Sequence, residues 1–237
     1  MTGEQMRVEC LPTADAAVGR AAEVIADLLG RAVGDRGHGL LALSGGHTAA
    51  RLAKGLAEAD PPWTAVQLFQ VDERLVPADH ADRNWRSLSL LARRLPEGHA
   101  HPMPVEDGRG ADHYQVTLVA AAGSPPVLDV VQLGVGADGH TASLPPGDPV
   151  LEVLDRDVAL SDEYAGHRRM TLTVPMLRRA RTVVWVVVGA DKADAVARMF
   201  SGDPSSVAGR VATASSVLVV DEEAAQLLPG GSSDSIG

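Results

Sequence analysis

The apolar residues follow two kinds of pattern along the chain. From Ala17 to Ala32 they recur every three or four positions, which is the spacing of an amphipathic helix. Thr13 precedes this segment as a candidate N-cap, and Gly34 and Gly37 follow as residues that end it. Residues 40–43 then form an unbroken apolar run, which is typical of a strand buried on both faces. The chain therefore begins with a helix followed by a buried strand.

The same alternation continues to the end of the chain. Further helices are predicted over residues 48–59, 84–95, 111–122 and 191–200, with a short last helix that ends at Leu228. Further strands are predicted over residues 8–11, 66–71, 127–133, 170–174, 183–188 and 217–220. Residues 96–110 are rich in Pro, Gly and His and are expected to be a long connection.

Alternating strands and helices, with several strands apolar throughout, predict an α/β fold: a mostly parallel twisted sheet with helices on both faces. No internal repeat or interdomain linker is visible, so we expect a single domain over residues 1–228. Residues 229–237 are rich in Gly and Ser and are predicted to be a disordered tail. In such sheets ligands bind at the carboxyl ends of the strands, so the informative loops are those that follow strands.

The composition favours a cytoplasmic protein. No stretch of the 237 residues approaches the roughly 20 apolar positions that cross a bilayer, and the first eleven residues lack the apolar run of a signal peptide. The one cysteine, Cys10, cannot form an internal disulfide and is expected to be buried on the first strand. We therefore expect no membrane partner.

The formal net charge of −10 disfavours nucleic acid as a partner, because an acidic protein does not attract a polyanion through its overall field. An anionic small molecule would need a local cluster of cations and backbone N–H groups.

The first candidate for such a cluster is the turn Ser44-Gly45-Gly46-His47-Thr48, which joins a predicted strand to a helix. Glycines let backbone N–H groups approach a ligand, and the helix N-terminus adds partial positive charge, so the turn suits a phosphate. A Gly-Gly turn after a strand is equally often structural, and both interpretations stay open on this segment alone. The turn is not a Walker A loop, since no Gly-Lys-Ser/Thr follows.

Three further cationic residues stand at the ends of predicted strands or at a helix start. Asp72, Glu73 and Arg74 follow the strand over residues 66–71, where Arg74 could receive an anion and Asp72 could orient a reacting group. A solvated turn is the alternative. Arg169 precedes another predicted strand, and Lys192 stands at a helix start, where it opposes the dipole unless an anion is bound.

The strongest motif is the loop from Gly134 to Leu144, in which three glycines surround Asp138 and His140. Histidine titrates near neutrality, so His140 can serve as a general base. The spacing lacks the third glycine of a dinucleotide-binding loop. Since no serine or cysteine nucleophile signature appears, water is the expected nucleophile. The other histidines show no metal-ligand spacing and are expected at the surface: His38, His80, His99, His101, His113 and His167.

Taken in order, these motifs resemble those of the 6-phosphogluconolactonases, which share a superfamily with the glucosamine-6-phosphate deaminases. The resemblance runs from about Val8 to Leu228. The family's S-G-G-S-T-P is matched at Ser44, Gly45, Gly46 and Thr48, and its remaining motifs are complete: D-E-R-x-V-P from Asp72, D-x-N-W from Asp82, G-x-G-x-D-G-H-T-A-S-L from Gly134, R-x-T-L-T from Arg169 and G-A-x-K-A from Gly189.

The resemblance implies a Rossmann-like, deaminase-like fold and hydrolysis of 6-phospho-D-glucono-1,5-lactone, the second step of the oxidative pentose phosphate pathway, without cofactor or metal. We expect a monomer. It implies that His140 is the base and that Asp72 lies beside the reacting ring. The residues expected to hold the phosphate and sugar are Ser44, Gly45, Gly46, His47, Thr48, Arg74, Asp138, Arg169 and Lys192. His47, Ala49 and Pro145 depart from the usual Ser, Pro and Phe, which bears on affinity more than on reaction type.

Two alternatives accompany this hypothesis. Deaminases of the superfamily share the segment up to His140 but continue to an F-N-E-P run, whereas Pro145 occupies the position of the Glu here. They also usually carry Tyr in place of Arg74. A non-catalytic sugar-phosphate sensor on the same scaffold is the second alternative, and the presence of His140 argues against it.

Overall fold

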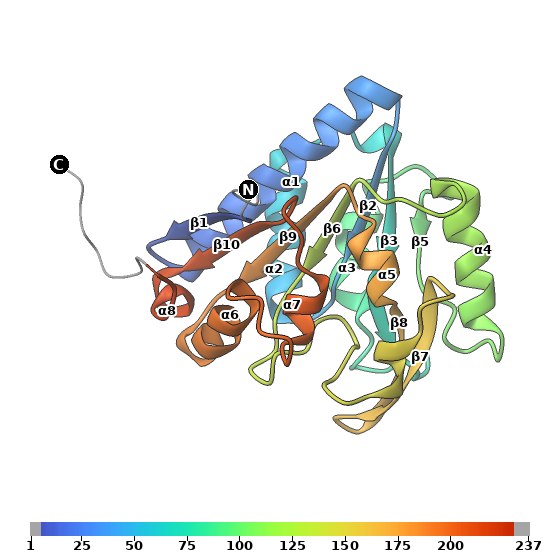
Figure 1. The fold of residues 1–237 in the computed structure, drawn as a ribbon. Helices are drawn as coiled ribbons and strands as arrows, with labels where there is room; N and C mark the ends of the chain where they lie inside the picture. Colours follow the sequence, from blue (N-terminus) through green and yellow to red (C-terminus); the bar gives the residue numbers. More distant parts are fainter. Residues whose placement is uncertain (1–5, 230–237) are drawn as a thin grey trace.

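The computed structural model describes residues 6–229 (Figure 1), so the predicted tail lies, apart from Pro229, outside the described residues. Within this range seven strands form one sheet in the order β1-β10-β9-β6-β2-β3-β5, and every neighbouring pair is parallel. Their bounds are β1 Arg7–Leu11, β2 Gly39–Leu43, β3 Val66–Gln70, β5 Ala100–His101, β6 Val130–Leu133, β9 Thr182–Val187 and β10 Val217–Asp221. The predicted α/β class with a parallel sheet is confirmed.

Helices cover both faces of this sheet, as predicted (Figure 1). Their bounds are α1 Ala14–Arg36, α2 His47–Ala59, α3 Trp85–Ala92, α4 Gly110–Ala122, α5 Val174–Arg178, α6 Ala193–Phe200, α7 Val207–Val211 and α8 Glu222–Ala225. The Thr13 hydroxyl accepts the Ala16 N–H and caps α1, and Gly37, at φ 77°, ends it. Gly34 lies inside the helix instead of ending it.

Alternate residues of each strand enter two separate cores. On β2, Leu41 and Leu43 pack with α1, α2 and α3, whereas Leu40 and Ala42 face the core that contains α4 to α8. This is the consequence of a period of two residues in a strand with both faces covered. Because both sides are apolar, the strands read as continuous apolar runs in the sequence.

A second, antiparallel sheet was not predicted. Its strands are β4 Asp72–Arg74, β7 Val158–Tyr164 and β8 His167–Leu172, in the order β4-β8-β7. The strand predicted over residues 170–174 therefore belongs to this small sheet, and Val174 already begins α5. Residues 96–110, expected to be a plain connection, contain the two-residue strand β5. Cys10 is exposed on β1, contrary to the expectation that it is buried.

The connections of the large sheet change direction between β2 and β6. From β2 the chain proceeds outward to β3 and β5, whereas from β6 it proceeds the other way, to β9 and β10. A crevice opens at the carboxyl ends of the strands at such a switch point, and ligands of open α/β sheets bind there. The loops after β2, β3, β6 and β9 all begin at this edge, and they carry the motifs found in the sequence.

Candidate active site

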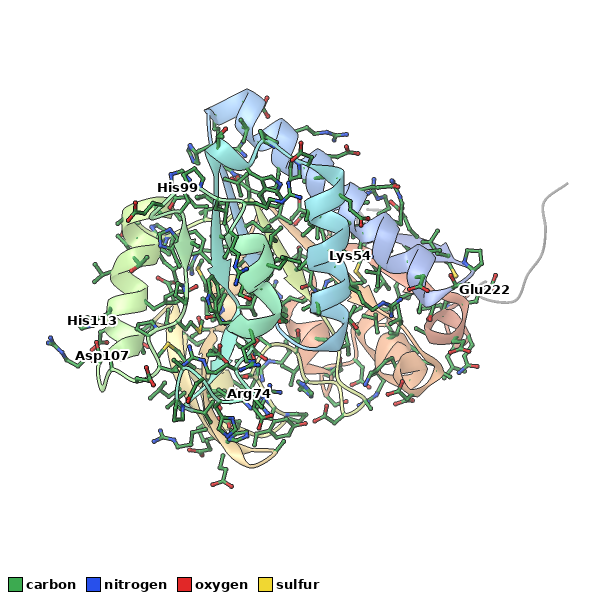
Figure 2. The ribbon with its side chains drawn as sticks, turned by 180° about the vertical axis from the view of Figure 1, so that it is seen from behind. Lys54, Arg74, His99, Asp107, His113 and Glu222 are labelled. Atoms are coloured by element: carbon green, nitrogen blue, oxygen red, sulfur yellow. The ribbon has the colours of Figure 1, made fainter. Side chains whose placement is uncertain are left out.

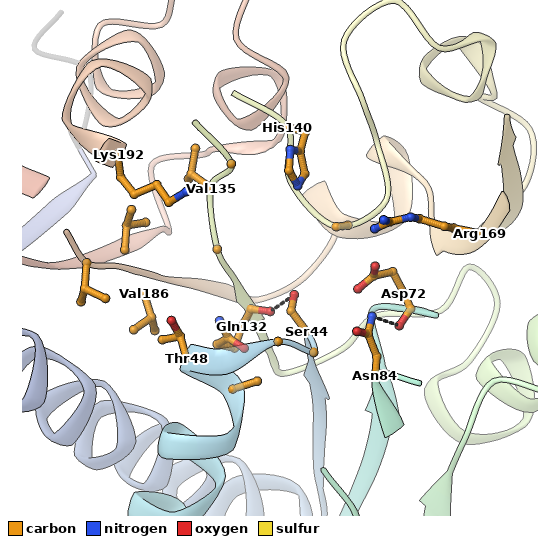
Figure 3. Close-up of a pocket in the computed structure, with 18 of the residues that line it drawn as sticks. Ser44, Thr48, Asp72, Asn84, Gln132, Val135, His140, Arg169, Val186 and Lys192 are labelled. Carbon is orange, nitrogen blue, oxygen red and sulfur yellow. Dashed lines mark hydrogen bonds between the residues drawn. The ribbon is translucent and has the colours of Figure 1, made fainter. Parts of the chain in front are cut away.

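A pocket of about 410 Å³ lies at this switch point (Figure 3). It brings together nine of the predicted site residues: Ser44, Gly45, Gly46, Thr48, Asp72, Arg74, His140, Arg169 and Lys192. In Figure 3, His140 and Arg169 lie across the pocket from Ser44 and Thr48, and Lys192 enters from the side of β9. Segments far apart in the sequence thus supply a histidine, three cations and a glycine turn to one space.

His140 is held by Asp138, which lies behind it and outside the lining of the pocket. The Asp138 Oδ1 atom is 2.6 Å from His140 Nδ1 and 3.1 Å from the His140 backbone nitrogen. Burial acts to raise the pKa of Asp138, but the hydrogen bonds from His140 and Tyr164 prevail and the pKa is lowered. An ionised carboxylate only accepts, so in the neutral imidazole Nδ1 carries the proton and Nε2 keeps its lone pair.

Gly136 makes this arrangement possible. A Cβ atom at this position would lie 2.1 Å from His140 Nδ1 and 2.7 Å from Asp138 Oδ1. Any side chain there would displace the imidazole, and only glycine lets the ring pack against the backbone.

We therefore expect Gly136→Ala to lower kcat by about 100-fold, because small misplacements of a reacting group cost rates of that order. Gly30→Ala is the control, since a Cβ at Gly30 on α1 meets no atom within 4 Å. Steady-state turnover of both variants measures the effect. Equal kcat values for the two variants would show that the ring tolerates displacement.

Asp72 is a largely buried residue of the pocket wall and is fixed by two partners. The Ser143 hydroxyl donates to Asp72 Oδ2 at 2.6 Å, and the Asn84 side chain donates to the Asp72 backbone carbonyl at 3.1 Å. Burial raises the pKa of the Asp72 carboxyl, although the Ser143 hydrogen bond and nearby Arg169 oppose this. The loop after β6 reaches Asp72 by turning at Ala142, whose φ of 52° lies in the left-handed region.

The two arginines stand directly opposite each other, since Arg74 on β4 pairs in register with Arg169 on β8. Like charges at such positions destabilise a sheet. Burial lowers the pKa of Arg169, and Arg74 lowers it further. Within the described residues both Nε groups are buried without a hydrogen-bond partner. A bound anion would satisfy these donors and relieve the repulsion.

Glu73, which lies between Asp72 and Arg74 on β4, is fully buried and organises the loop around them. Its carboxylate accepts from the backbone nitrogens of Arg74, Asn84 and Trp85 at 2.7–2.9 Å. It also accepts from the Gln70 amide and pairs with Arg83. Two of these bonds satisfy N–H groups at the start of α3, which places Asn84 against Asp72.

We expect Glu73→Gln to lower the free energy of unfolding by about 2–4 kcal/mol, since an amide cannot accept all of these bonds and leaves the Arg83 charge buried. Urea denaturation measures the change. Glu97→Gln, at an exposed loop position, is the control and should stay within about 0.5 kcal/mol of wild type. If Glu73→Gln lowered the free energy of unfolding by no more than this control, the loop between β4 and α3 would be held by its other contacts.

Sequence reasoning missed four residues of the site: Asn84, Gln132, Ser143 and Tyr164. Asn84 approaches the glycine turn at Gly45 closely, because a Cβ on Gly45 would lie 2.3 Å from the Asn84 side-chain amide carbon. The Gln132 side-chain oxygen is buried in the pocket wall without a partner among the described residues. The available signal for Gln132 was that it interrupts an otherwise apolar strand.

The histidines set aside in the sequence lie away from the pocket lining, but three of them are not fully at the surface as expected. His99, His101 and His167 are half-buried. His99 bonds the Val66 carbonyl, and His101 bonds the Gln67 side chain. Burial lowers the pKa of His101. Figure 2 shows His99 at the opposite end of the sheet from Arg74.

His47 begins α2, but its side chain lies outside what the structure describes, so its part in binding stays a prediction. Among the described side chains, no three of the types His, Cys, Asp and Glu gather as a metal site. In the same part of the chain, no helix combines the length and apolar character needed to span a bilayer.

Comparison with known proteins agrees with the motifs. The family described as glucosamine-6-phosphate isomerases/6-phosphogluconolactonase matches residues 12–220. The 6-phosphogluconolactonase of Mycobacterium tuberculosis is 39% identical, over 94% of this chain and 98% of its own, and that of Synechocystis is 36% identical, over 86% and 90%.

Solved structures share the fold. A 6-phosphogluconolactonase from Leishmania guyanensis superposes with a TM-score of 0.82 at 27% identity, over 94% of this chain and 99% of that one. The corresponding Trypanosoma cruzi protein gives 0.86 at 25% identity, over 96% and 98%. The resemblance stated from the sequence is thus confirmed. The chain belongs to the glucosamine-6-phosphate isomerase/6-phosphogluconolactonase family.

Proposed function

We propose that the protein hydrolyses 6-phospho-D-glucono-1,5-lactone to 6-phospho-D-gluconate, with His140 as general base. The observation that carries the proposal is the juxtaposition of a base with two arginines in one pocket. In the neutral imidazole His140 keeps a free Nε2, and Arg74 and Arg169 line the same pocket, each with a buried Nε donor that has no partner among the described residues. A substrate that carries a phosphate a few bonds from its reacting carbonyl needs a base at the carbonyl and cations at the phosphate. Curated relatives that match most of the chain carry the name 6-phosphogluconolactonase.

In this scheme His140 Nε2 accepts a proton as a water oxygen bonds to the lactone C1. The carbonyl electrons move to its oxygen and form a tetrahedral oxyanion. As the carbonyl re-forms, the bond between C1 and the ring oxygen breaks, and His140 returns its proton to that oxygen, which becomes the C5 hydroxyl. The Asp138 carboxylate faces the imidazolium throughout and stabilises its charge. Only water and side chains are required.

The remaining residues position the substrate. The glycine turn of Ser44, Gly45 and Gly46 leads into α2, whose N-terminal N–H groups suit phosphate oxygens, and Thr48 lies beside them. Lys192 pairs at 2.9 Å with Asp191, an exposed partner that competes weakly with a phosphate. Asp72 lies on the other side of the pocket, where its carboxyl can bond a sugar hydroxyl.

A comparison of two substrates tests the proposal against the deaminase and sensor alternatives. The purified protein is incubated with freshly prepared lactone and, separately, with glucosamine 6-phosphate, and 6-phosphogluconate and ammonia are measured. We expect the acid from the lactone and no ammonia from the amino sugar. Release of ammonia would indicate a deaminase, and binding of both compounds without turnover would indicate a sensor.

We further infer that the protein acts as a cytoplasmic monomer without a nucleic-acid partner. Nine of the predicted site residues line a single pocket of the chain, and the net charge of −10 opposes binding of polyanions at large. Light scattering of the purified protein measures the mass, which we expect at 24.7 kDa.

A further inference from the structure

Tyr164 contacts the Asp138–His140 pair from a strand that none of the sequence motifs includes. It is the last residue of β7, and its hydroxyl lies 2.9 Å from Asp138 Oδ2 and 3.3 Å from His140 Nδ1. Its ring meets the imidazole edge to face, with centroids 5.3 Å apart. The tyrosine thus occupies the carboxylate oxygen that His140 leaves free.

The direction of this hydrogen bond follows from the charges. Burial raises the pKa of the Tyr164 phenol, and the Asp138 carboxylate raises it further, so the hydroxyl keeps its proton near neutrality. The ionised carboxylate can only accept, and Nδ1 of His140 already donates to the other oxygen. Tyr164 is therefore a donor to Asp138 Oδ2.

Tyr164 is itself fixed by the hairpin that carries it. Tyr164 pairs with His167 across Ala165 and Gly166, whose φ values of 50° and 81° are positive, as a tight type I′ turn requires. On the face of its ring lies the Arg169 guanidinium, 5.3 Å from the centroid. At the tip, His167 Nε2 lies 3.0 Å from Asp82 Oδ2 and ties the hairpin to the loop after β4.

We propose that Tyr164 is a positioning residue that acts on His140 through Asp138. Its hydroxyl fixes the rotation of the carboxylate, so that Oδ1 faces Nδ1, and it withdraws negative charge from the carboxylate. The inference rests on the proposed function in that His140 is taken as the base. Both hydrogen bonds from His140 reach Oδ1 of this carboxylate, and among the described residues Tyr164 alone donates to Oδ2.

Removing the hydroxyl has an effect of defined sign. Without the Tyr164 donor on Oδ2, Asp138 carries more negative charge toward the imidazole and stabilises the imidazolium. The titration midpoint of His140 then moves to higher pH. The other charged groups around His140 are unchanged by the substitution: Asp72 across the pocket, Arg169 on β8, Lys192 before α6, and Arg198 of α6 with its partner Asp194.

Tyr164→Phe in the full chain tests the proposal, because it keeps the ring and removes only the hydroxyl. The acidic limb of the kcat/KM profile and the ¹⁵N imidazole titration of His140, assigned with His140→Ala, are both measured. We expect both midpoints to move up by roughly half a pH unit, with kcat reduced about 3- to 10-fold and KM within about twofold. Midpoints that stay in place or move down would overturn the proposal.

Two comparisons separate the hydroxyl from the hairpin. His167→Gln breaks the other tie of the same hairpin tip and should leave the midpoints in place. A shift as large as that of Tyr164→Phe would assign the effect to the hairpin and overturn the proposal.

Incorporation of 3-fluorotyrosine leaves the hydroxyl in place and makes it a stronger hydrogen-bond donor. The titration midpoint of His140 should then move to lower pH, and movement to higher pH would overturn the proposal. The chain has only one other tyrosine, Tyr114, which bonds Gln70 inside the core.

The NMR titration needs no substrate. If the wild-type protein leaves the lactone unhydrolysed, the proposed function fails on that result alone, while the titration still decides whether Tyr164 acts on His140.

Discussion

His140→Ala is expected to lower kcat by about 10²–10⁴-fold, with the affinity for 6-phosphogluconate changed less than about threefold. Within the described pocket lining, His140 alone combines a nitrogen lone pair, on Nε2, with a carboxylate partner. The hydrogen bond between His140 Nδ1 and Asp138 places the proton on Nδ1 and so leaves Nε2 free. Alanine removes the base and leaves the arginines in place. Steady-state kinetics and calorimetric titration of the product measure the two quantities.

His113→Ala is the matched control for this prediction. His113 also pairs with an aspartate, Asp107, at 2.5 Å, but it is exposed on α4 and lies outside the pocket lining. Its removal should leave kcat within about twofold. If His140→Ala kept near-wild-type kcat at neutral pH, His140 would be ruled out as the base.

The second large effect is expected from the pair of arginines. A charge-assisted hydrogen bond contributes about 1.5–3 kcal/mol, so Arg74→Ala or Arg169→Ala alone should weaken binding of 6-phosphogluconate about 10- to 100-fold. The double variant should lose more than either single variant, up to about 10³-fold. Because the two guanidinium groups repel each other across the sheet, the double loss is expected to fall short of the product of the single losses. Calorimetry on the four proteins completes the cycle.

Arg168→Ala provides the control at the neighbouring position of β8. Successive side chains of a strand point to opposite faces, and Arg168 lines a different cavity, with Leu75 and Arg109. Its loss should leave affinity within about threefold. The substrate supplies a second control, since unphosphorylated gluconolactone should be hydrolysed poorly and at similar rates by all variants. Equal losses on both lactones would place the arginines away from the phosphate.

The large sheet could be predicted because its cause is local. Both faces of each strand are covered, so apolar residues stand at every position, and the helices between them repeat with a period near 3.6. Asp72, His140 and Lys192 each follow a predicted strand, and ligands of parallel sheets meet the carboxyl ends of the strands, so the sequence alone places these residues in one region. His140 and the cations could be identified from their residue types and positions.

The small sheet could not be predicted in the same way. The three residues of β4, Asp72 to Arg74, are all charged, and they form a strand only because β8 pairs with them. That pairing spans almost a hundred residues and leaves no periodic signal. The same long-range contacts bring in Tyr164 from β7 and bury Glu73, whose partners Asn84 and Trp85 follow eleven and twelve positions later. The sequence therefore indicated which residue types can act as bases or bind anions. The pairing of β4 with β8 decides which of them lie in the same site.

The central claim is that water attacks the lactone C1 with His140 as base, and ¹³C NMR of the 1-¹³C-labelled δ-lactone in ¹⁸O-enriched water tests it directly. Spectra are followed with wild-type protein, with His140→Ala and without protein. We predict that wild type accelerates loss of the δ-lactone and places ¹⁸O on the C1 carboxylate, while the rate with His140→Ala falls by at least about 100-fold toward the spontaneous one. Decay at the spontaneous rate with wild type, or equal acceleration by both proteins, would contradict the account.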